Sequence, residues 1–95
     1  MEFTPIMLTV PGALGALVRQ RRRSQHLRID DAAALIGVSV DLMSRLENGQ
    51  GSVRLDKALA VLDGLGLAML VVPKEHAWAH STKSKLVASE PGDIL

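Results

Sequence analysis

Apolar residues recur at spacings of three and four along the first two thirds of the chain, which is the pattern of helices that bury one face. This periodicity predicts four helices, over about residues 11–23, 30–36, 40–48 and 55–65. Pro11 favours the start of the first helix, because the N–H that proline lacks would have no partner in a first turn. Residues 11–65 are therefore predicted to form a helical domain.

Glycine and serine mark the ends of these helices. Gly37 permits a sharp turn between the second and third helices, and Ser39 is a good N-cap for the third. Gly49 stops the third helix after about Asn48, and Gly66 ends the fourth. A helix, a short glycine turn and a second helix together form the layout of a helix-turn-helix.

The pattern changes after the fourth helix. Leu67–Val72 is a continuous apolar run closed by Pro73, which favours a strand covered on both faces. Gly64 and Gly66 disfavour the alternative, a fraying end of the fourth helix. A lone strand leaves its backbone unpaired, and the only other strand candidate is Ile6–Val10. Pairing with a two-fold mate satisfies that backbone, so we expect a homodimer built on Leu67, Met69, Leu70, Val71 and Val72.

Composition removes several classes of function. The 95 residues include no cysteine, which excludes a disulfide scaffold, a thiolate zinc site and a cysteine nucleophile. Only Phe3 and Trp78 are aromatic, so bases are not expected to stack on a ring platform. No phosphate-binding glycine loop, dinucleotide motif or catalytic cluster is present, which predicts a protein that is not an enzyme and has no cofactor. The longest apolar stretch, residues 58–72, is too short and interrupted to span a bilayer, and no secretory signal is present, which predicts a cytoplasmic protein.

The third helix has one apolar and one polar side. Stepping about 100° per residue, Leu42, Met43 and Leu46 fall on the apolar side. The opposite arc, about 140° wide, holds Val40, Asp41, Ser44, Arg45 and Asn48. This division suits the second helix of a helix-turn-helix, which presents its outer face to the major groove. An ordinary amphipathic surface helix would show the same division.

Two short segments carry a family resemblance. Leu35–Ser39 (LIGVS) followed by Met43–Gly49 (MSRLENG) resembles the signature of the XRE/Cro-repressor-like helix-turn-helix family, over roughly Pro11 to Leu65. Gly51–Asp56 and Val61–Leu67 further resemble the HipB-like antitoxins and their regulator relatives. The resemblance implies an all-α, five-helix, lambda-repressor-like domain with a short C-terminal β-strand that pairs across a homodimer, and binding to a palindromic operator in double-stranded DNA.

The resemblance also implies a function. The chain is expected to be a transcriptional repressor, the antitoxin of a HipBA-like operon that represses its own operon and neutralises a toxin resembling a HipA-type kinase. Two alternatives stay open: a stand-alone XRE-type regulator without a toxin, and a toxin-binding interaction module with weak DNA binding. The expected parts are an N-terminal extension (1–10), the helix-turn-helix DNA-binding domain (11–66), a dimerisation strand (67–73) and a mobile or partner-binding tail (74–95).

The outer face of the third helix supplies candidates for reading DNA. Arg45 can bond O6 and N7 of guanine together, although it can also contact a phosphate or stay solvated. Asp41 can accept from cytosine N4, and because it repels phosphates it can also disfavour wrong sites. The candidate base-reading residues are Val40, Asp41, Ser44 and Arg45. The candidate phosphate-binding residues are Arg19, Arg23, Arg28, Ser39, Asn48 and Gln50.

The family pattern also bears on one ion pair and on two departures of this chain from it. In the family, an arginine of the first helix pairs with the glutamate of the ENG segment, and the resemblance therefore implies a partly buried, structural ion pair between Arg22 and Glu47. The family favours glycine where this chain has His26, and because histidine adopts left-handed backbone poorly, we expect this turn to be rearranged. The usual Thr-Gln at the start of the second helix is replaced by Arg28 and Ile29, of which Arg28 can contact a phosphate.

The last part of the sequence, after about residue 74, holds two histidines and the single tryptophan. His76 and His80 are spaced as a metal pair on a helix, but without cysteine or an acid beyond Glu75 nearby no metal site is expected. Trp78 either folds back on the dimer sheet or anchors a partner protein.

The formal net charge is only +1, yet five positive charges without an acid lie within ten residues, namely Arg19, Arg21, Arg22, Arg23 and Arg28. A charge near zero therefore does not exclude DNA binding.

Overall fold

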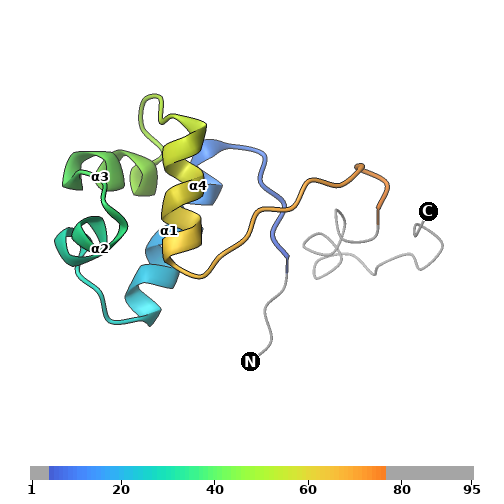
Figure 1. Ribbon diagram of the computed structural model, residues 1–95. Helices are drawn as coiled ribbons and strands as arrows, with labels where there is room; N and C mark the ends of the chain where they lie inside the picture. The colour runs from blue at the N-terminus through green and yellow to red at the C-terminus, as the bar shows by residue number, and fades with distance from the viewer. Residues whose placement is uncertain (1–4, 77–95) are drawn as a thin grey trace. The chain divides into compact units, whose positions relative to one another are not determined.

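The computed structural model describes residues 5–76. The chain divides into two compact units, one of Thr9–Met69 and one that joins Met1–Leu8 with Leu70–Leu95. The first unit holds the four helices of the described residues, as Figure 1 shows. They are α1 (Pro11–Ser24), α2 (Ile29–Ile36), α3 (Val40–Asn48) and α4 (Leu55–Gly64).

The ends of the helices follow local chemistry. Pro11 is the first residue of α1, and Ser39 caps α3 because its Oγ accepts a hydrogen bond from the N–H of Leu42 at 3.0 Å. Gly37 and Gly49 close α2 and α3 with φ angles of +88° and +64°, in the left-handed region that glycine adopts without strain. The predicted roles of these residues at the helix ends are confirmed.

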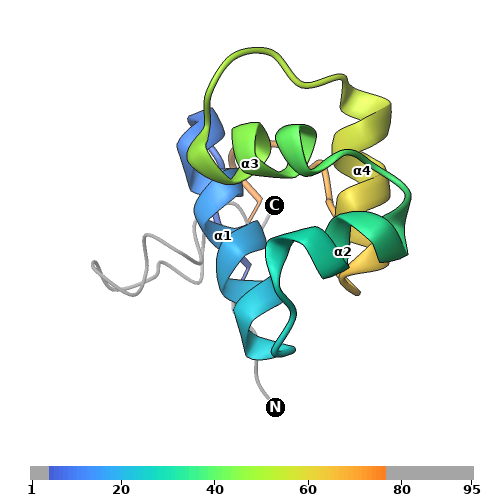
Figure 2. The same ribbon diagram turned by 90° about the vertical axis from the view of Figure 1, so that its left-hand side faces the viewer.

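The helices pack around one small aliphatic core. Figure 2 looks onto α2 and α3, with α1 on the left and α4 on the right. Helix α3 contacts both α1 and α2, and α2 also contacts α4. Two alanines of α2 are fully buried, and small side chains let this short helix approach its neighbours closely. The core consists of Val18, Ala32, Ala33, Met43, Leu46, Val61, Leu62 and Leu65.

One glycine brings α1 directly onto the end of α3. Gly15 is buried, and a Cβ at this position would overlap the backbone carbonyl oxygens of Leu46 and Glu47. Any side chain here would therefore push the two helices apart. The close approach places the middle of α1 beside the last turn of α3, where the sequence predicted an ion pair.

The segment after α4 differs from the prediction. Within residues 5–76 the structure shows four helices and no strand, so the fifth helix and the strand expected at Leu67–Val72 are not found there. Leu67 packs against the core and its N–H donates to the Leu62 carbonyl at 2.8 Å, whereas Leu70 and Val71 are exposed. A strand requires a partner for its ladder of hydrogen bonds, and no strand lies beside this run within residues 5–76. No helix in the described part of the chain is long and apolar enough to cross a membrane.

Candidate nucleic-acid interface

Helix α3 divides into a buried and an open side, as its sequence pattern predicted. Met43, Leu46 and Glu47 are buried, and the side of α3 away from them is accessible to solvent. Asp41 and Asn48 are exposed and Val40 is 45% exposed, while Ser44 and Arg45 are half-buried. All the candidate base-reading residues therefore lie on the accessible side of this helix.

Two of the candidate base-reading residues contact each other. Arg45 Nε donates to Asp41 Oδ2 at 3.0 Å, one helical turn earlier, and Arg45 Nη1 donates to the Ser52 carbonyl oxygen at 2.8 Å. The guanidinium is thus held by α3 and by the loop that follows it. This double anchorage had no signal in the sequence beyond the i, i+4 spacing of the two charges.

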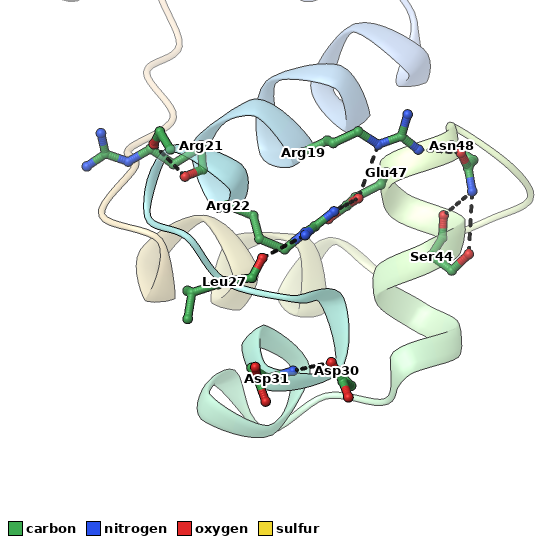
Figure 3. Close-up of polar contacts among 10 residues, drawn as sticks. Arg19, Arg21, Arg22, Leu27, Asp30, Asp31, Ser44, Glu47 and Asn48 are labelled. Carbon is green, nitrogen blue, oxygen red and sulfur yellow. Dashed lines mark hydrogen bonds and ion pairs between the residues drawn. The ribbon is translucent and has the colours of Figure 1, made fainter.

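A second chain of contacts joins α3 to α1. Asn48 Nδ2 donates to the Ser44 carbonyl oxygen at 2.9 Å, and Arg19 Nη2 donates to Asn48 Oδ1 at 2.6 Å. Figure 3 shows Arg19 approaching Asn48 and Glu47 from α1. Arg19 and Asn48, both candidate phosphate-binding residues, are therefore brought together and are bonded to each other.

The expected partners Arg22 and Glu47 lie in direct contact inside the domain. Arg22 Nε donates to Glu47 Oε2 at 2.6 Å and Arg22 Nη2 donates to Oε1 at 2.9 Å, a two-bond arrangement in which the planar guanidinium matches the carboxylate. Arg19 Nε donates to the same carboxylate at 3.3 Å. Arg22 Nη1 also donates to the Leu27 carbonyl oxygen at 2.8 Å. The pair therefore links α1, α3 and the turn before α2.

The electrostatics of this pair favour its charged form. Burial by itself raises the pKa of Glu47, but the hydrogen bonds and positive charges of Arg22 and Arg19 outweigh burial and hold this pKa below its ordinary value. The hydrogen bond to Glu47 raises the pKa of Arg22 above its ordinary value despite burial. Within residues 5–76, every buried side-chain nitrogen and oxygen has a hydrogen-bond partner. Glu47 is thus ionised at neutral pH.

The turn before α2 corrects one expectation. His26 has a φ of +60°, so it adopts the left-handed backbone that a glycine would adopt, and the turn is not rearranged. His26 N–H donates to the Arg23 carbonyl at 2.9 Å and Leu27 N–H donates to the Arg22 carbonyl at 3.2 Å, which close the end of α1. Arg22 holds the far side of the same turn through the Leu27 carbonyl. These contacts fix a conformation that histidine alone disfavours.

The other candidate phosphate-binding residues lie on three separate segments. Arg23 is exposed in the last turn of α1, and Arg28 is exposed immediately before α2, where it pairs with Asp30 at 3.4 Å. Gln50 is exposed in the loop after α3. Ser39 uses its hydroxyl to cap α3. These residues share no contact network, unlike Arg19 and Asn48.

Sequence reasoning missed the contacts that close the end of α4. Arg21 Nε and Gln25 Nε2 both donate to the Leu65 carbonyl oxygen, at 2.8 and 3.0 Å. Arg21 and Gln25 lie 44 and 40 positions before Leu65 in the sequence, so no local pattern indicates these contacts. Arg21, one of the five arginines between residues 19 and 28, is thus partly engaged in holding α1 to α4. Trp78 and His80, discussed as partner anchor and metal ligand, lie outside the described residues.

Comparison with known proteins agrees with this geometry. The sequence profile of the helix-turn-helix domain family matches residues 13–71. The chain is 36% identical over 69 residues to the uncharacterized HTH-type transcriptional regulator y4mF of Sinorhizobium fredii, covering 72% of this chain and 91% of that protein.

Solved structures share the fold. The clp gene regulator ClgR from C. glutamicum is similar with a TM-score of 0.58 and 26% identity, over 67% of this chain and 82% of that one. A chain of the HipA–HipB–O2–O3 complex gives a TM-score of 0.65 at 20% identity, over 72% of this chain and 96% of that one. The resemblance found in the sequence is therefore confirmed, and the chain belongs to the XRE-like helix-turn-helix domain family.

Proposed function

We propose that this protein is a homodimeric, sequence-specific transcriptional repressor whose helix α3 enters the major groove of double-stranded operator DNA. One observation carries the proposal. Helix α3 buries Met43, Leu46 and Glu47 against the domain and presents the side with Asp41 and Arg45 to solvent, after the left-handed turn at Gly37. This is the arrangement by which a recognition helix reaches base edges while the rest of the domain contacts the backbone.

In this proposal, contacts divide into those that read bases and those that hold phosphates. Arg45 bonds guanine, and Val40, Asp41 and Ser44 line the same side of α3. Arg23, Arg28 and Gln50 are exposed and contact phosphates, together with Arg19, Ser39 and Asn48. Arg22 and Glu47 stabilise the fold and do not contact DNA, because both are buried in their mutual ion pair.

A salt titration of DNA binding tests the function. Fluorescence anisotropy with the full chain and a labelled duplex from upstream of its own gene is expected to show affinity that falls steeply with salt, because each neutralised phosphate releases counterions. A double Arg23→Ala and Arg28→Ala variant should flatten this slope by more than twice the change seen with Arg54→Ala, which removes a single exposed arginine before α4 and serves as the control. Absent binding to upstream and random DNA would favour an interaction module instead.

The homodimer rests on the apolar run after α4. Val71 and Leu70 are 89% and 62% exposed, and Met69 is 39% exposed. Exposed large aliphatic side chains favour pairing with a two-fold mate, which would make a strand of Leu67, Met69, Leu70, Val71 and Val72. Light scattering at micromolar concentration is expected to give a dimer, and Val71→Lys to give a monomer. A monomer from the unmodified chain would remove this part of the proposal.

A partner toxin is the second element of the proposal. The fold similarity to a chain of the HipA–HipB–O2–O3 complex favours an antitoxin that binds a kinase-like toxin of HipA type and represses its own operon. The names of the relatives y4mF and ClgR, which mention only regulation, favour the stand-alone regulator. Sequencing the neighbouring reading frame and co-purifying its product with a tagged chain separates the two. A kinase-like product that binds the chain supports the antitoxin, and an unrelated neighbour that does not bind supports the regulator.

A further inference from the structure

The guanidinium of Arg45 is more constrained than an exposed arginine usually is. Its side chain is 39% exposed, yet Nε is bonded to the Asp41 carboxylate on α3 and Nη1 to the Ser52 carbonyl in the following loop. An arginine side chain carries considerable rotamer entropy, which a binding event must otherwise restrict. Two anchors on different segments restrict that freedom before any ligand arrives.

The donors that remain free are those that suit a base edge. Arginine has five N–H groups, and Asp41 and Ser52 use one on Nε and one on Nη1. One N–H on Nη1 and both on Nη2 are left. Nη1 and Nη2 together form the outer end of the guanidinium fork, and this end can bond O6 and N7 of guanine at once. The hydrogen bond to Asp41 therefore uses the N–H on Nε, which a contact of Nη1 and Nη2 with guanine does not require.

The carboxylate also directs the arginine along the helix. Asp41 lies one turn before Arg45, towards the N-terminal end of α3, and is 79% exposed on its side chain. Side chains on a helix lean towards its N-terminus, so this spacing lets the pair form without strain. In a helix-turn-helix the N-terminal residues of the recognition helix lie nearest the bases. The contact with Asp41 thus draws Arg45 towards the end of the helix that reaches deepest.

We propose that Asp41 is a positioning residue for specificity, which holds Arg45 so that the outer end of its guanidinium faces a guanine and does not drift to a phosphate. This inference rests on the proposed DNA-binding function and deepens it. It assigns Asp41 a role through Arg45, in place of direct readout of cytosine. Because Asp41 itself repels phosphates, it also disfavours complexes in which α3 is not seated on its site.

The role predicts opposite effects of one substitution on two kinds of DNA. Asp41→Asn should weaken binding to a duplex selected from a randomised pool by the unmodified protein by about two- to fivefold, because Arg45 loses its orientation. Binding to sonicated genomic DNA should stay unchanged or tighten by up to about twofold, because a negative charge is removed. Asp41→Glu, which keeps a carboxylate at the same spacing, should restore most of the discrimination.

Asp56→Asn is the matched control. Asp56 forms another exposed pair, with Arg54 at 2.9 Å outside α3, so its substitution also removes one negative charge and one contact with an arginine. It should leave the ratio of specific to non-specific affinity unchanged. Thermal unfolding of each variant verifies that the fold is intact.

A double-mutant cycle decides whether Asp41 acts through Arg45. In an Arg45→Ala background, Asp41→Asn should no longer change the ratio of specific to non-specific affinity. If the ratio still falls in that background, Asp41 contacts DNA directly and the inference is wrong. An equal tightening on both DNAs would show a plain charge effect and would overturn it too. In each of these cases the unmodified protein still binds DNA, whereas no binding by it to any duplex would overturn the proposed function and this inference with it.

Discussion

Helix α3 takes part in two arginine–carboxylate pairs of the same chemistry in opposite surroundings. Glu47 points inward and is bonded twice by Arg22, with side chains that are 2% and 10% exposed. Asp41 points to solvent and is bonded once by Arg45, with side chains that are 79% and 39% exposed. The Arg22–Glu47 pair links α1, α3 and the turn before α2, whereas Asp41 and Arg45 both belong to α3.

This difference in burial determines how much each pair contributes to the stability of the fold. A buried pair is costly to break, because the partner left behind is a charge without water or a counter-ion. An exposed pair contributes little to stability, since water and salt replace it easily. The stability of the fold therefore depends on the Arg22–Glu47 pair, whereas substitution of Asp41 or Arg45 should change the stability little.

Breaking the buried pair should have the largest effect. Arg22→Ala is expected to destabilise the fold by about 3–5 kcal/mol, because Glu47 remains buried with only the weaker contact from Arg19. Chemical denaturation measures the loss. Arg23→Ala, which removes the adjacent exposed arginine, should change stability by at most about 0.5 kcal/mol. An Arg22→Ala variant of normal stability that fails to bind DNA would show that Arg22 contacts DNA instead.

Acid should weaken the same pair. The folded pKa of Glu47 lies below its ordinary value, so its contribution to stability is present above the ordinary value and is lost as pH falls through the folded pKa. The midpoint of thermal unfolding should therefore fall with pH more steeply for the unmodified protein than for Glu47→Gln, which has no group to titrate. Parallel curves for the two proteins in acid would contradict the assignment.

The turn that Arg22 supports offers a smaller, opposite effect. His26→Gly is expected to stabilise the protein by about 0.5–1 kcal/mol, because glycine adopts the φ of +60° without strain. This relief of strain outweighs the destabilising effect of glycine's greater conformational freedom in the unfolded chain. Ser24→Gly, in the helical backbone of α1, should be destabilising and is the control. A loss of stability in His26→Gly would indicate that the imidazole makes a contact that matters more than the backbone.

Breaking the exposed pair should affect stability least. Asp41→Asn is expected to cost at most about 0.5 kcal/mol, and the cost should shrink further as salt screens the charges. Denaturation at low and high salt measures it, with Asp56→Asn as the comparison. A loss similar to that of Arg22→Ala would mean that Asp41 supports the fold, and the contrast between the two pairs would not hold.

The local features of this protein were accessible from its sequence. The spacing of apolar residues predicted the four helices found within residues 5–76, Ser39 and Gly37 predicted the entry to α3, and the LIGVS and MSRLENG segments indicated the family. Each of these signals depends on neighbours within a few residues, because caps, turns and helical faces are set by short-range geometry. The division of α3 into a buried and an open side followed from the same periodicity.

What the sequence alone determined, then, is which residues form helices and which side of α3 is apolar. Only the tertiary structure decided how individual charges are used: that Arg21 closes the end of α4, that Arg19 bonds Asn48, and that Arg45 is anchored by Ser52. It also decided that His26 accepts a left-handed backbone, since contacts on both sides of the turn outweigh its intrinsic preference. A long flexible arginine can reach many acceptors, and the packing of helices distant in sequence selects among them.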